Sequence, residues 1–284
     1  YNEIITYSFI SPTYYDKIDL PKDSPLRNSL KILNPLGEDT SIMRTTTLPS
    51  MLEILTRNYN FRNKSAKLYE LGRTYFAKKD GSGMADEPKV LSLGAYGPDM
   101  DFFALKGAGE TVLEGLRITG ARYEAEQENP SYHPGRCAKV YCGDKLLGVL
   151  GQIHPQVAAN YGVDGELYAA ELRFDALYES IGPEPIYQPL PKFPAVTRDI
   201  AVVCDKAVTV GALEDCIRRG AHGLLKDVAL FDIYTGVGIP SGKKSVAFNL
   251  TLRADDRNLT AEEADEDVKS ILDLLKTELD AVLR

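Results

Sequence analysis

The sequence predicts an α+β protein made of two domains, each with an antiparallel sheet. The chain has 284 residues, which is enough for two domains that bury separate cores. A proline-rich segment divides it. On both sides of that segment, short runs of alternating apolar residues, typical of strands, outnumber the runs with helical spacing.

The bulk composition is that of an ordinary globular protein, with 44% hydrophobic and 26% charged residues. A formal net charge of -8 argues against a protein that coats nucleic acid through overall positive charge, so we expect no DNA partner. Neither a membrane-spanning run of about 18 apolar residues nor a signal sequence is evident, and we expect a soluble, cytoplasmic chain without a membrane partner. Because it opens on Tyr1 and not on Met, we expect a piece of a longer polypeptide.

Cysteine and histidine spacings predict no metal site. The four cysteines form neither paired CxxC motifs nor a single CxxC motif, and the three histidines are scattered without HExxH. We therefore expect plain buried or half-buried thiols at Cys137, Cys142, Cys204 and Cys216. Phosphate-binding and hydrolase motifs are also missing, because Lys106 to Gly109 lacks the remaining residues of a GxxxxGK[ST] loop and no GxSxG occurs.

The domain boundary is predicted at IGPEPIYQPLPKFP, residues 181–194. It holds five prolines in fourteen residues, which favours a stiff extended connector. We expect a first domain at 1–183, a linker at 184–191 and a second domain at 192–284.

The first domain reads as a strand-rich α+β unit. Helices are expected at 44–61 and 101–116, and a glycine-containing loop at 80–83 should follow the second strand. Short turns such as Gly143-Asp144 favour an antiparallel sheet covered by helices over a doubly wound parallel sheet. Strands are expected at 4–10, 67–79, 90–97, 118–126, 136–143, 145–153 and 166–174.

The second domain has a regular order of elements. Strands are expected at 197–204, 228–236, 244–254 and 281–284. Thr209 should cap a helix at 211–220, and Thr260 with Glu263 should form a capping box for a helix that runs to about Asp280. The order βαββαβ is that of a ferredoxin-like domain, in which two helices cover one face of the sheet and leave the other free.

Several motifs in both domains resemble one family. The motifs are NPLGEDTSIMRTTTLPSML, LYELGRTYF, HPGRCAKVYCGDKLLGVLGQIHP, KFPAVTRDIAVV, LFDIYTG and GKKSVAFNLTLR. In this order they resemble the C-terminal half of the bacterial phenylalanyl-tRNA synthetase β subunit, over essentially the entire chain. The resemblance implies a class II synthetase-like antiparallel sheet in a catalytic-like module, followed by a ferredoxin-like anticodon-binding domain, with the subunit's earlier domains outside this chain.

The resemblance also implies that the first domain is catalytically inactive. Class II synthetases stabilise the α-phosphate of ATP with an arginine in an FRxE strand motif and a second arginine in a later glycine-rich ER motif. Here Phe76 and Lys78 stand where that arginine and glutamate would be, and no ER motif follows before the linker. Arg73 lies three residues away and is expected on the opposite face. We therefore expect no catalytic residue or cofactor in this chain, with ATP and Mg²⁺ used by the whole enzyme.

In the family, the catalytic-like module packs against the α subunit, and two such heterodimers form an α2β2 heterotetramer. The helix at 44–61 carries an apolar stripe that fits either this subunit interface or ordinary core packing, since periodicity does not separate the two. The stripe consists of Leu48, Met51, Leu52, Leu55 and Tyr59.

By the same resemblance, the second domain binds the anticodon of tRNA-Phe. Tyr234 would stack on a base, and Asp232, two residues away on the same face, would accept from a guanine edge. At the position of Thr197 related subunits can carry an aromatic residue, a contact that threonine does not supply. The cationic candidates for tRNA contact are Lys192, Arg198, Lys243, Lys244, Arg253 and Arg257.

Simpler interpretations remain open. Arg198 could pair with Asp199, and the two hairpin lysines could be solvated. A small-molecule-binding regulatory module with a βαββαβ domain is an alternative function, which a ligand pocket would favour and salt-dependent tRNA binding would not. An autonomous ligase is a third, which ATP–pyrophosphate exchange by this chain alone would establish.

Overall fold

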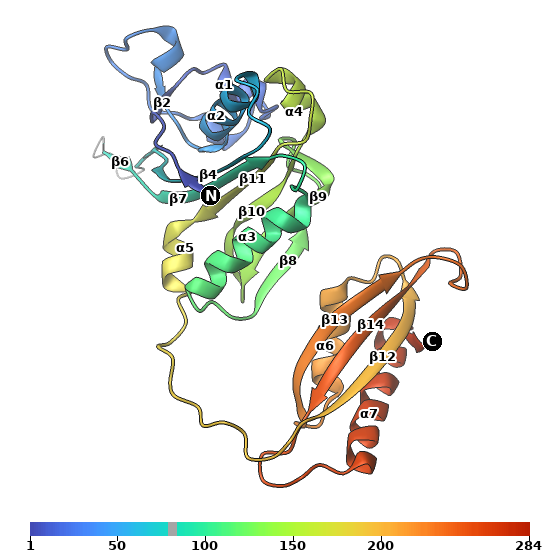
Figure 1. Cartoon of the computed structure of the whole chain (residues 1–284). Coiled ribbons are helices and arrows are strands. Elements are labelled where there is room, and N and C mark those ends of the chain that lie inside the picture. The colour runs from blue at the N-terminus through green and yellow to red at the C-terminus, as the bar shows by residue number, and fades with distance from the viewer. Residues whose placement is uncertain (79–83) are drawn as a thin grey trace. The chain divides into compact units, whose positions relative to one another are not determined.

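The computed structural model describes residues 1–78 and 84–284, so the loop predicted at 80–83 lies outside the described residues. The chain forms two compact units, Tyr1–Glu184 and Pro185–Arg284 (Figure 1). Residues 181–195, which include the prolines, contain neither helix nor strand. Each unit is described by itself below.

The first unit is built on a seven-stranded sheet. All neighbouring strands in it are antiparallel except the β1–β4 pair, which is parallel. Gly143, at a φ of 57°, makes the tight turn between the β9 and β10 strands, as its sequence predicts. The strand order is β1 (Asn2–Glu3), β4 (Ala66–Arg73), β7 (Lys89–Tyr96), β11 (Tyr168–Arg173), β10 (Lys145–Ile153), β9 (Tyr132–Cys142) and β8 (Ala121–Ala125).

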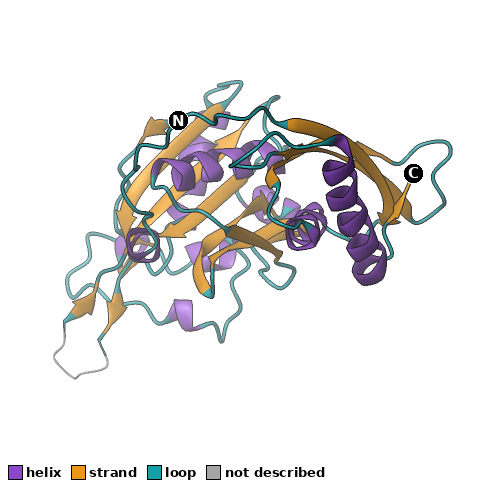
Figure 2. Cartoon of the chain, turned by 90° about the horizontal axis from the view of Figure 1, so that it is seen from below, coloured by secondary structure: helices purple, strands orange, loops and turns teal. Residues whose placement is uncertain are grey.

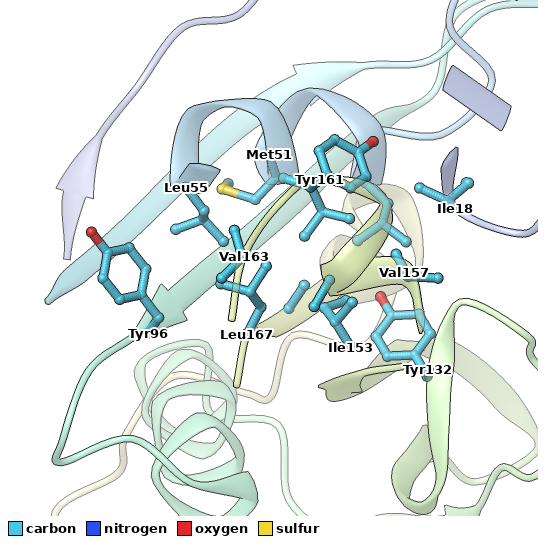
Figure 3. Close-up of a cluster of buried hydrophobic side chains, with 14 of the residues drawn as sticks. Ile18, Met51, Leu55, Tyr96, Tyr132, Ile153, Val157, Tyr161, Val163 and Leu167 are labelled. Atoms are coloured by element: carbon cyan, nitrogen blue, oxygen red, sulfur yellow. The ribbon is translucent and has the colours of Figure 1, made fainter. Parts of the chain in front are cut away.

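Helices cover both faces of this sheet. Helix α2 (Leu48–Asn60) packs on one face, and its Met51 and Leu55 share a core with Val157 and Tyr161 (Figure 3). Helices α3 (Phe102–Gly115) and α5 (Phe174–Glu179) cover a second core on the other face of the sheet (Figure 1). Leu93 and Ala95 of β7 belong to this second core, because successive side chains of a strand point to opposite faces. The remaining elements are α1 (Tyr14–Lys17), α4 (Pro155–Asn160), β2 (Phe9–Ile10), β3 (Ile42–Met43), β5 (Phe76–Ala77), β6 (Ala85–Asp86) and two short 3-10 turns at Pro25–Arg27 and Glu38–Thr40.

Two strand predictions fail in part, for physical reasons. Of the strand predicted at 4–10 only Phe9–Ile10 is a strand, and it pairs with β3 outside the large sheet, while the strand predicted at 67–79 is interrupted after Arg73. In the strand predicted at 4–10, the Ile4 amide donates to the Tyr69 carbonyl at 2.8 Å, but the Thr6 amide donates to the side-chain Oε1 of Glu70 at 3.1 Å. A side chain thus replaces the backbone acceptor, and regular pairing stops. The strand predicted at 67–79 likewise ends at Arg73, because the Tyr75 amide turns to the Arg44 carbonyl at 2.9 Å.

The start of α2 is held by a carboxylate from the sheet. The helix has no acidic residue in its first turn, and the Thr47 side chain makes no cap hydrogen bond. Instead Glu171 of β11 accepts from the backbone amides of Thr47 at 2.7 Å and Leu48 at 3.2 Å, and from the Thr46 hydroxyl at 2.7 Å. A negative charge at a helix N-terminus satisfies free amides and complements the helix dipole.

Replacing Glu171 with alanine is therefore expected to lower the free energy of unfolding of the first unit by about 2–3 kcal/mol, because hydrogen bonds to a charged acceptor are lost and the amides stay buried. Urea unfolding and hydrogen exchange at the first amides of α2 measure the effect. Glu179→Ala, which removes an exposed partner of Lys145, is the matched control and should change stability little. Equal losses in the two variants would contradict this role for Glu171.

The second unit has the predicted βαββαβ order. Its four strands are antiparallel, and both predicted helix caps are present: Thr209 accepts from the Ala212 amide at 3.2 Å, and Thr260 with Glu263 forms a capping box. Helices α6 and α7 pack on one face of the sheet (Figure 2). The elements in chain order are β12 (Val196–Asp205), α6 (Val210–Gly220), β13 (Leu225–Tyr234), β14 (Lys243–Leu252), α7 (Ala261–Leu279) and β15 (Val282–Leu283), and the sheet order is β13-β14-β12-β15.

Neither unit carries a membrane span, since none of the helices in the described part of the chain is both long and apolar enough to cross a bilayer. The four cysteines are free thiols. Cys137, Cys204 and Cys216 are buried and Cys142 is half-buried, which confirms the expectation from their spacing. Burial raises the pKa of Cys137 to about 12, so its thiol stays protonated and unreactive at neutral pH.

Candidate functional site

The open face of the second unit's sheet, the face that α6 and α7 leave uncovered, is the first candidate site. Strand register decides which side chains lie on it. Tyr234 pairs with Ser245 and Asp232 with Ala247, while the alternate residues of β14, such as Phe248, belong to the helix-covered core. Tyr234 and Asp232 therefore share the open face, as predicted. Thr197 also lies there, opposite Thr251.

Small side chains make the middle of the open face flat. Ala201 of β12 pairs with Ala247 of β14, and Ala229 of β13 pairs with Asn249. Tyr234 stands at one end of this platform. Thr197 stands near the other end. Ser245, the partner of Tyr234, pairs on its other side with Val203 of β12, and Thr197 lies six residues from Val203 along that strand, which is roughly 20 Å. One nucleotide cannot contact both.

The Tyr234 ring is held in place from two sides. Its hydroxyl donates to the Val237 carbonyl at 3.3 Å, and the Arg284 guanidinium lies over its ring, 5.4 Å from the centroid. Gly236 makes room for this arrangement, because a Cβ atom there would lie 2.3 Å from the tyrosine hydroxyl. The side chain remains partly exposed, so a flat aromatic surface and a cation meet at one end of the platform.

Two of the predicted cationic contacts are not on this face. Arg198 lies on the helix-covered side, where its Nε donates to Asp265 of α7 at 2.9 Å. The alternative pairing with Asp199 is therefore wrong, since the partner lies 67 residues away, and the structure does not bring Arg198 together with Tyr234 on the open face. Arg257 is held by Glu263 at 2.6 Å, next to the capping box.

The other predicted cations are scattered. Lys243 pairs with Asp280 at 3.2 Å, Lys244 lies on the helix-covered side opposite Cys204, and Lys192 is exposed before β12 begins. Arg253 is half-buried, and its Nε has no hydrogen-bond partner among the described residues. The structure thus brings none of these four to the Tyr234 ring.

Sequence reasoning missed Arg284, which reaches the open face, and the exposed Phe231 of β13. Arg284 gave no signal, because only the fold brings the last strand close enough for its side chain to reach Tyr234. Phe231 is left unpaired at the register shift between Leu230 and Asp232 and is 59% exposed, a bulge that strict alternation does not predict. The only sequence signal for Phe231 was its place in the LFDIYTG motif, next to Asp232.

The first unit has a cavity of about 490 Å³ beside the segment predicted as a strand at 67–79. Phe76 lines it, which places an apolar ring where the resemblance would require the ATP-binding arginine. Arg73 is not among the lining residues and pairs instead with Glu87 at 3.3 Å. Arg173, a cation that sequence reasoning missed, does line the cavity. The other lining residues are Leu26, Thr45, Thr46, Thr74, Asp86, Pro88, Lys89, Val90, Glu171 and Asp175.

A buried ion pair between Arg44 and Glu70 lies next to this cavity. Arg44 is 1% exposed and Glu70 3% exposed, and the Arg44 Nη2 lies 3.2 Å from the Glu70 Oε1. The Arg44 Nε also donates to the Arg73 carbonyl at 2.8 Å, and its Nη1 donates to the Thr6 hydroxyl at 2.6 Å. Gly72 provides the space, because a Cβ atom there would lie 2.4 Å from Nη2. This arginine ties three segments together and is not free to bind a phosphate.

The predicted subunit-interface stripe on α2 is largely wrong. Leu48, Met51, Leu52 and Leu55 are at most 3% exposed in the chain's own core, so they do not form a contact surface. Tyr59 is half-buried, and its hydroxyl donates to the Asp164 carbonyl at 3.1 Å. Large apolar side chains stay exposed at several other places in this unit. Ile5 is 92% and Tyr7 83% exposed in the N-terminal segment, and Leu33 and Leu36 are 96% and 99% exposed.

Metal-ligating residues do not converge in either unit: within residues 1–78 and 84–284, no group of three or more His, Cys, Asp or Glu side chains is placed to hold an ion.

Comparison with known proteins covers both units. The family profile described as "Phenylalanyl tRNA synthetase beta chain CLM domain" matches residues 1–174, and that described as "Ferredoxin-fold anticodon binding domain" matches residues 191–284. Among solved structures, pyrrolysyl-tRNA synthetase from Desulfitobacterium hafniense superposes with a TM-score of 0.51 at 16% identity, over 63% of this chain and 62% of that one. That likeness concerns the fold alone.

Curated relatives match along the entire chain. The phenylalanine–tRNA ligase β subunit of Clostridium tetani is 46% identical over 100% of this chain and 36% of its own length. That of Symbiobacterium thermophilum is 40% identical over 99% of this chain and 32% of its own length. The chain thus spans about a third of the length of these relatives. It belongs to the phenylalanyl-tRNA synthetase β chain family.

Proposed function

We propose that this chain is a non-catalytic part of the β subunit of a cytoplasmic phenylalanine–tRNA ligase. It binds the anticodon region of tRNA-Phe and contacts the α subunit within an α2β2 assembly, while the α subunit uses ATP and Mg²⁺ to attach phenylalanine to the tRNA. The observation that carries the proposal is the open face of the ferredoxin-like unit, in a chain whose family is that of a tRNA ligase.

The open face has the chemistry that unpaired bases need. Tyr234 and Phe231 offer aromatic rings, and Asp232 offers an acceptor for the edge of a guanine. Arg284 supplies a cation that can stack on a base or reach a phosphate. We therefore assign anticodon contact to Asp232, Tyr234, Phe231 and Arg284, with Thr197 as a separate contact at the far end.

The first unit serves assembly in this proposal. Its cavity presents Phe76 where the resemblance would place the ATP-binding arginine, and Arg44 is committed to Glu70. The cations that do line the cavity are Lys89 and Arg173, which stand outside the quoted strand motif, so we assign this unit no ATP chemistry. Exposed apolar side chains at Ile5 and Tyr7 fit the contact with the α subunit, because a protein surface of this kind is stabilised by being covered.

The assembly role is tested by mixing the chain with the cognate α subunit and tRNA-Phe and analysing complexes by size-exclusion chromatography. We expect a complex that contains all three. Ile5→Ser with Tyr7→Ser is expected to weaken binding to the α subunit at least tenfold without lowering the thermal stability of the chain, because both side chains are exposed. Unchanged assembly of this variant would remove the N-terminal segment from the interface. If the unaltered chain binds neither α subunit nor tRNA, the proposal fails.

The cavity also favours a second function. A volume of about 490 Å³ is within the size range of small-molecule sites, and it joins apolar walls to the charges of Arg173 and Asp86. A regulatory ligand is therefore the alternative to an assembly role for the first unit. Ligand-dependent stabilisation of this chain by a small metabolite, without any effect of tRNA, would favour it.

A further inference from the structure

A strongly basic segment follows the C-terminal end of α2, far along the chain from the anticodon candidates. Residues 54–69 contain Arg57, Arg62, Lys64 and Lys67 and no Asp or Glu, although the chain has a net charge of -8. No other acid-free stretch of the sequence holds more than three Lys or Arg residues. We call residues 57–67 the α2–β4 basic segment. Its four cations are exposed, and none of them takes part in an ion pair recorded within the described residues.

The segment is held in one conformation although it lies between elements. The Tyr96 hydroxyl donates to the Asn63 carbonyl at 3.0 Å, and the Asn63 amide donates to the Asn58 carbonyl at 3.2 Å. The Arg57 guanidinium lies 5.9 Å from the centroid of the Phe61 ring, which is 72% exposed. The Asn63 side-chain amide also donates to the Asn58 Oδ1 at 2.8 Å, so the segment presents its cations and an aromatic ring on a fixed backbone.

Arg62 occupies a position that suits glycine better. Its φ is 63°, in the left-handed region just after the helix end, where residues with a Cβ atom are disfavoured and glycine is common. Among the described residues, no ion pair of the Arg62 side chain is recorded that would offset this backbone strain. Such an exception points to a role for the side chain outside the fold.

Helix stabilisation does not account for the whole segment. Cations in the last turn of a helix complement its dipole, but only Arg57 lies in the last turn of α2. Arg62, Lys64 and Lys67 come after the helix has ended, where the dipole effect fades. The charge of these three is left for a partner.

We propose that the α2–β4 basic segment binds the phosphate backbone of RNA, at a part of the tRNA other than the anticodon. Arginine, lysine and asparagine side chains are the usual donors to phosphate oxygens, and the segment carries all three with Phe61 available to stack on an unpaired base. An acidic protein surface would use the cations but not the ring and the amides. The identity of the RNA as tRNA rests on the proposed function, whereas contact between this segment and phosphates does not.

The main test compares two ligands, full-length tRNA-Phe and its isolated anticodon stem–loop, binding to the whole 284-residue chain at several salt concentrations. In a variant with Arg57→Gln, Arg62→Gln and Lys64→Gln, affinity for full-length tRNA should fall about 10-fold or more at low salt. The slope of log K against log salt should become shallower by roughly 2–3. Affinity for the anticodon stem–loop should stay unchanged. The matched control replaces three exposed cations elsewhere in the same unit, Lys22, Lys31 and Arg122, with glutamine and should leave the salt slope unchanged.

A single variant separates a structural role from an RNA-binding role. Arg62→Gly should keep or raise the melting temperature, because glycine adopts a φ of 63° freely, and should still lower the affinity for full-length tRNA about threefold. If the second unit binds the anticodon stem–loop, Tyr234→Ala must lower the affinity for it. An unchanged affinity in Tyr234→Ala, together with a lowered affinity for full-length tRNA in Arg62→Gly, would overturn only the anticodon assignment. Unchanged salt dependence in the triple variant, or loss of α subunit binding with normal RNA binding, would overturn this proposal.

Discussion

Replacing Arg44 with methionine is expected to lower the free energy of unfolding of the first unit by about 3–5 kcal/mol. The substitution leaves the Glu70 carboxylate 3% exposed without its cation, and an unpaired buried charge is strongly destabilising. It also removes the donors to the Arg73 carbonyl and the Thr6 hydroxyl. For a unit of this size the melting temperature should fall by roughly 10 °C.

Differential scanning calorimetry of the chain measures this effect, with the transition of the first unit followed separately because two units need not unfold together. Arg73→Met is the matched control, since its pair with Glu87 is about half exposed and should contribute less than about 1 kcal/mol. Adding Glu70→Leu to Arg44→Met should recover much of the loss, because the isolated charge is then removed. A loss from Arg44→Met no larger than that from Arg73→Met would show that the pair does not organise the sheet.

Local signals predict the regular elements of this fold well. The Thr209 cap starts α6 and the Thr260–Glu263 capping box starts α7, as the sequence indicates. These features depend on neighbours in sequence. The same holds for the turn at Gly143, whose backbone conformation is set by the residue itself.

Contacts between distant segments are not predictable in this way. The ion pair between Arg198 and Asp265 joins a strand to a helix across the unit, so the sequence near Arg198 suggested Asp199 instead. Glu171 reaches the start of α2 from β11, and Arg284 reaches Tyr234 from the last strand. The α2 stripe shows a related limit, because apolar spacing is the same whether a helix faces its own core or a partner.

Replacing Tyr234 with alanine is expected to weaken binding to the tRNA-Phe anticodon stem–loop about 5- to 150-fold. The loss of one stacked base is worth about 1–3 kcal/mol, and each 1.4 kcal/mol is a factor of ten. Tyr234→Phe keeps the ring and should retain most of the affinity, although the hydroxyl contact with the Val237 carbonyl is lost. Arg284→Ala should weaken binding as well, since its guanidinium lies over the ring.

The control for this series is Tyr187→Ala, which removes a tyrosine that is 86% exposed outside the open face and should not change affinity. All variants are compared at one salt concentration, because phosphate contacts make absolute affinities depend on salt. Tyr234 is partly exposed at the end of an edge strand, so its replacement should leave the fold and the melting temperature nearly unchanged.

The most direct measurement is chemical probing of the anticodon loop of tRNA-Phe in the presence of the chain. If the open face binds the anticodon, the anticodon bases are protected by the unaltered chain and by Tyr234→Phe, and become accessible again with Tyr234→Ala. Anticodon bases that remain accessible when the chain is bound, or that stay protected by Tyr234→Ala, would contradict the account.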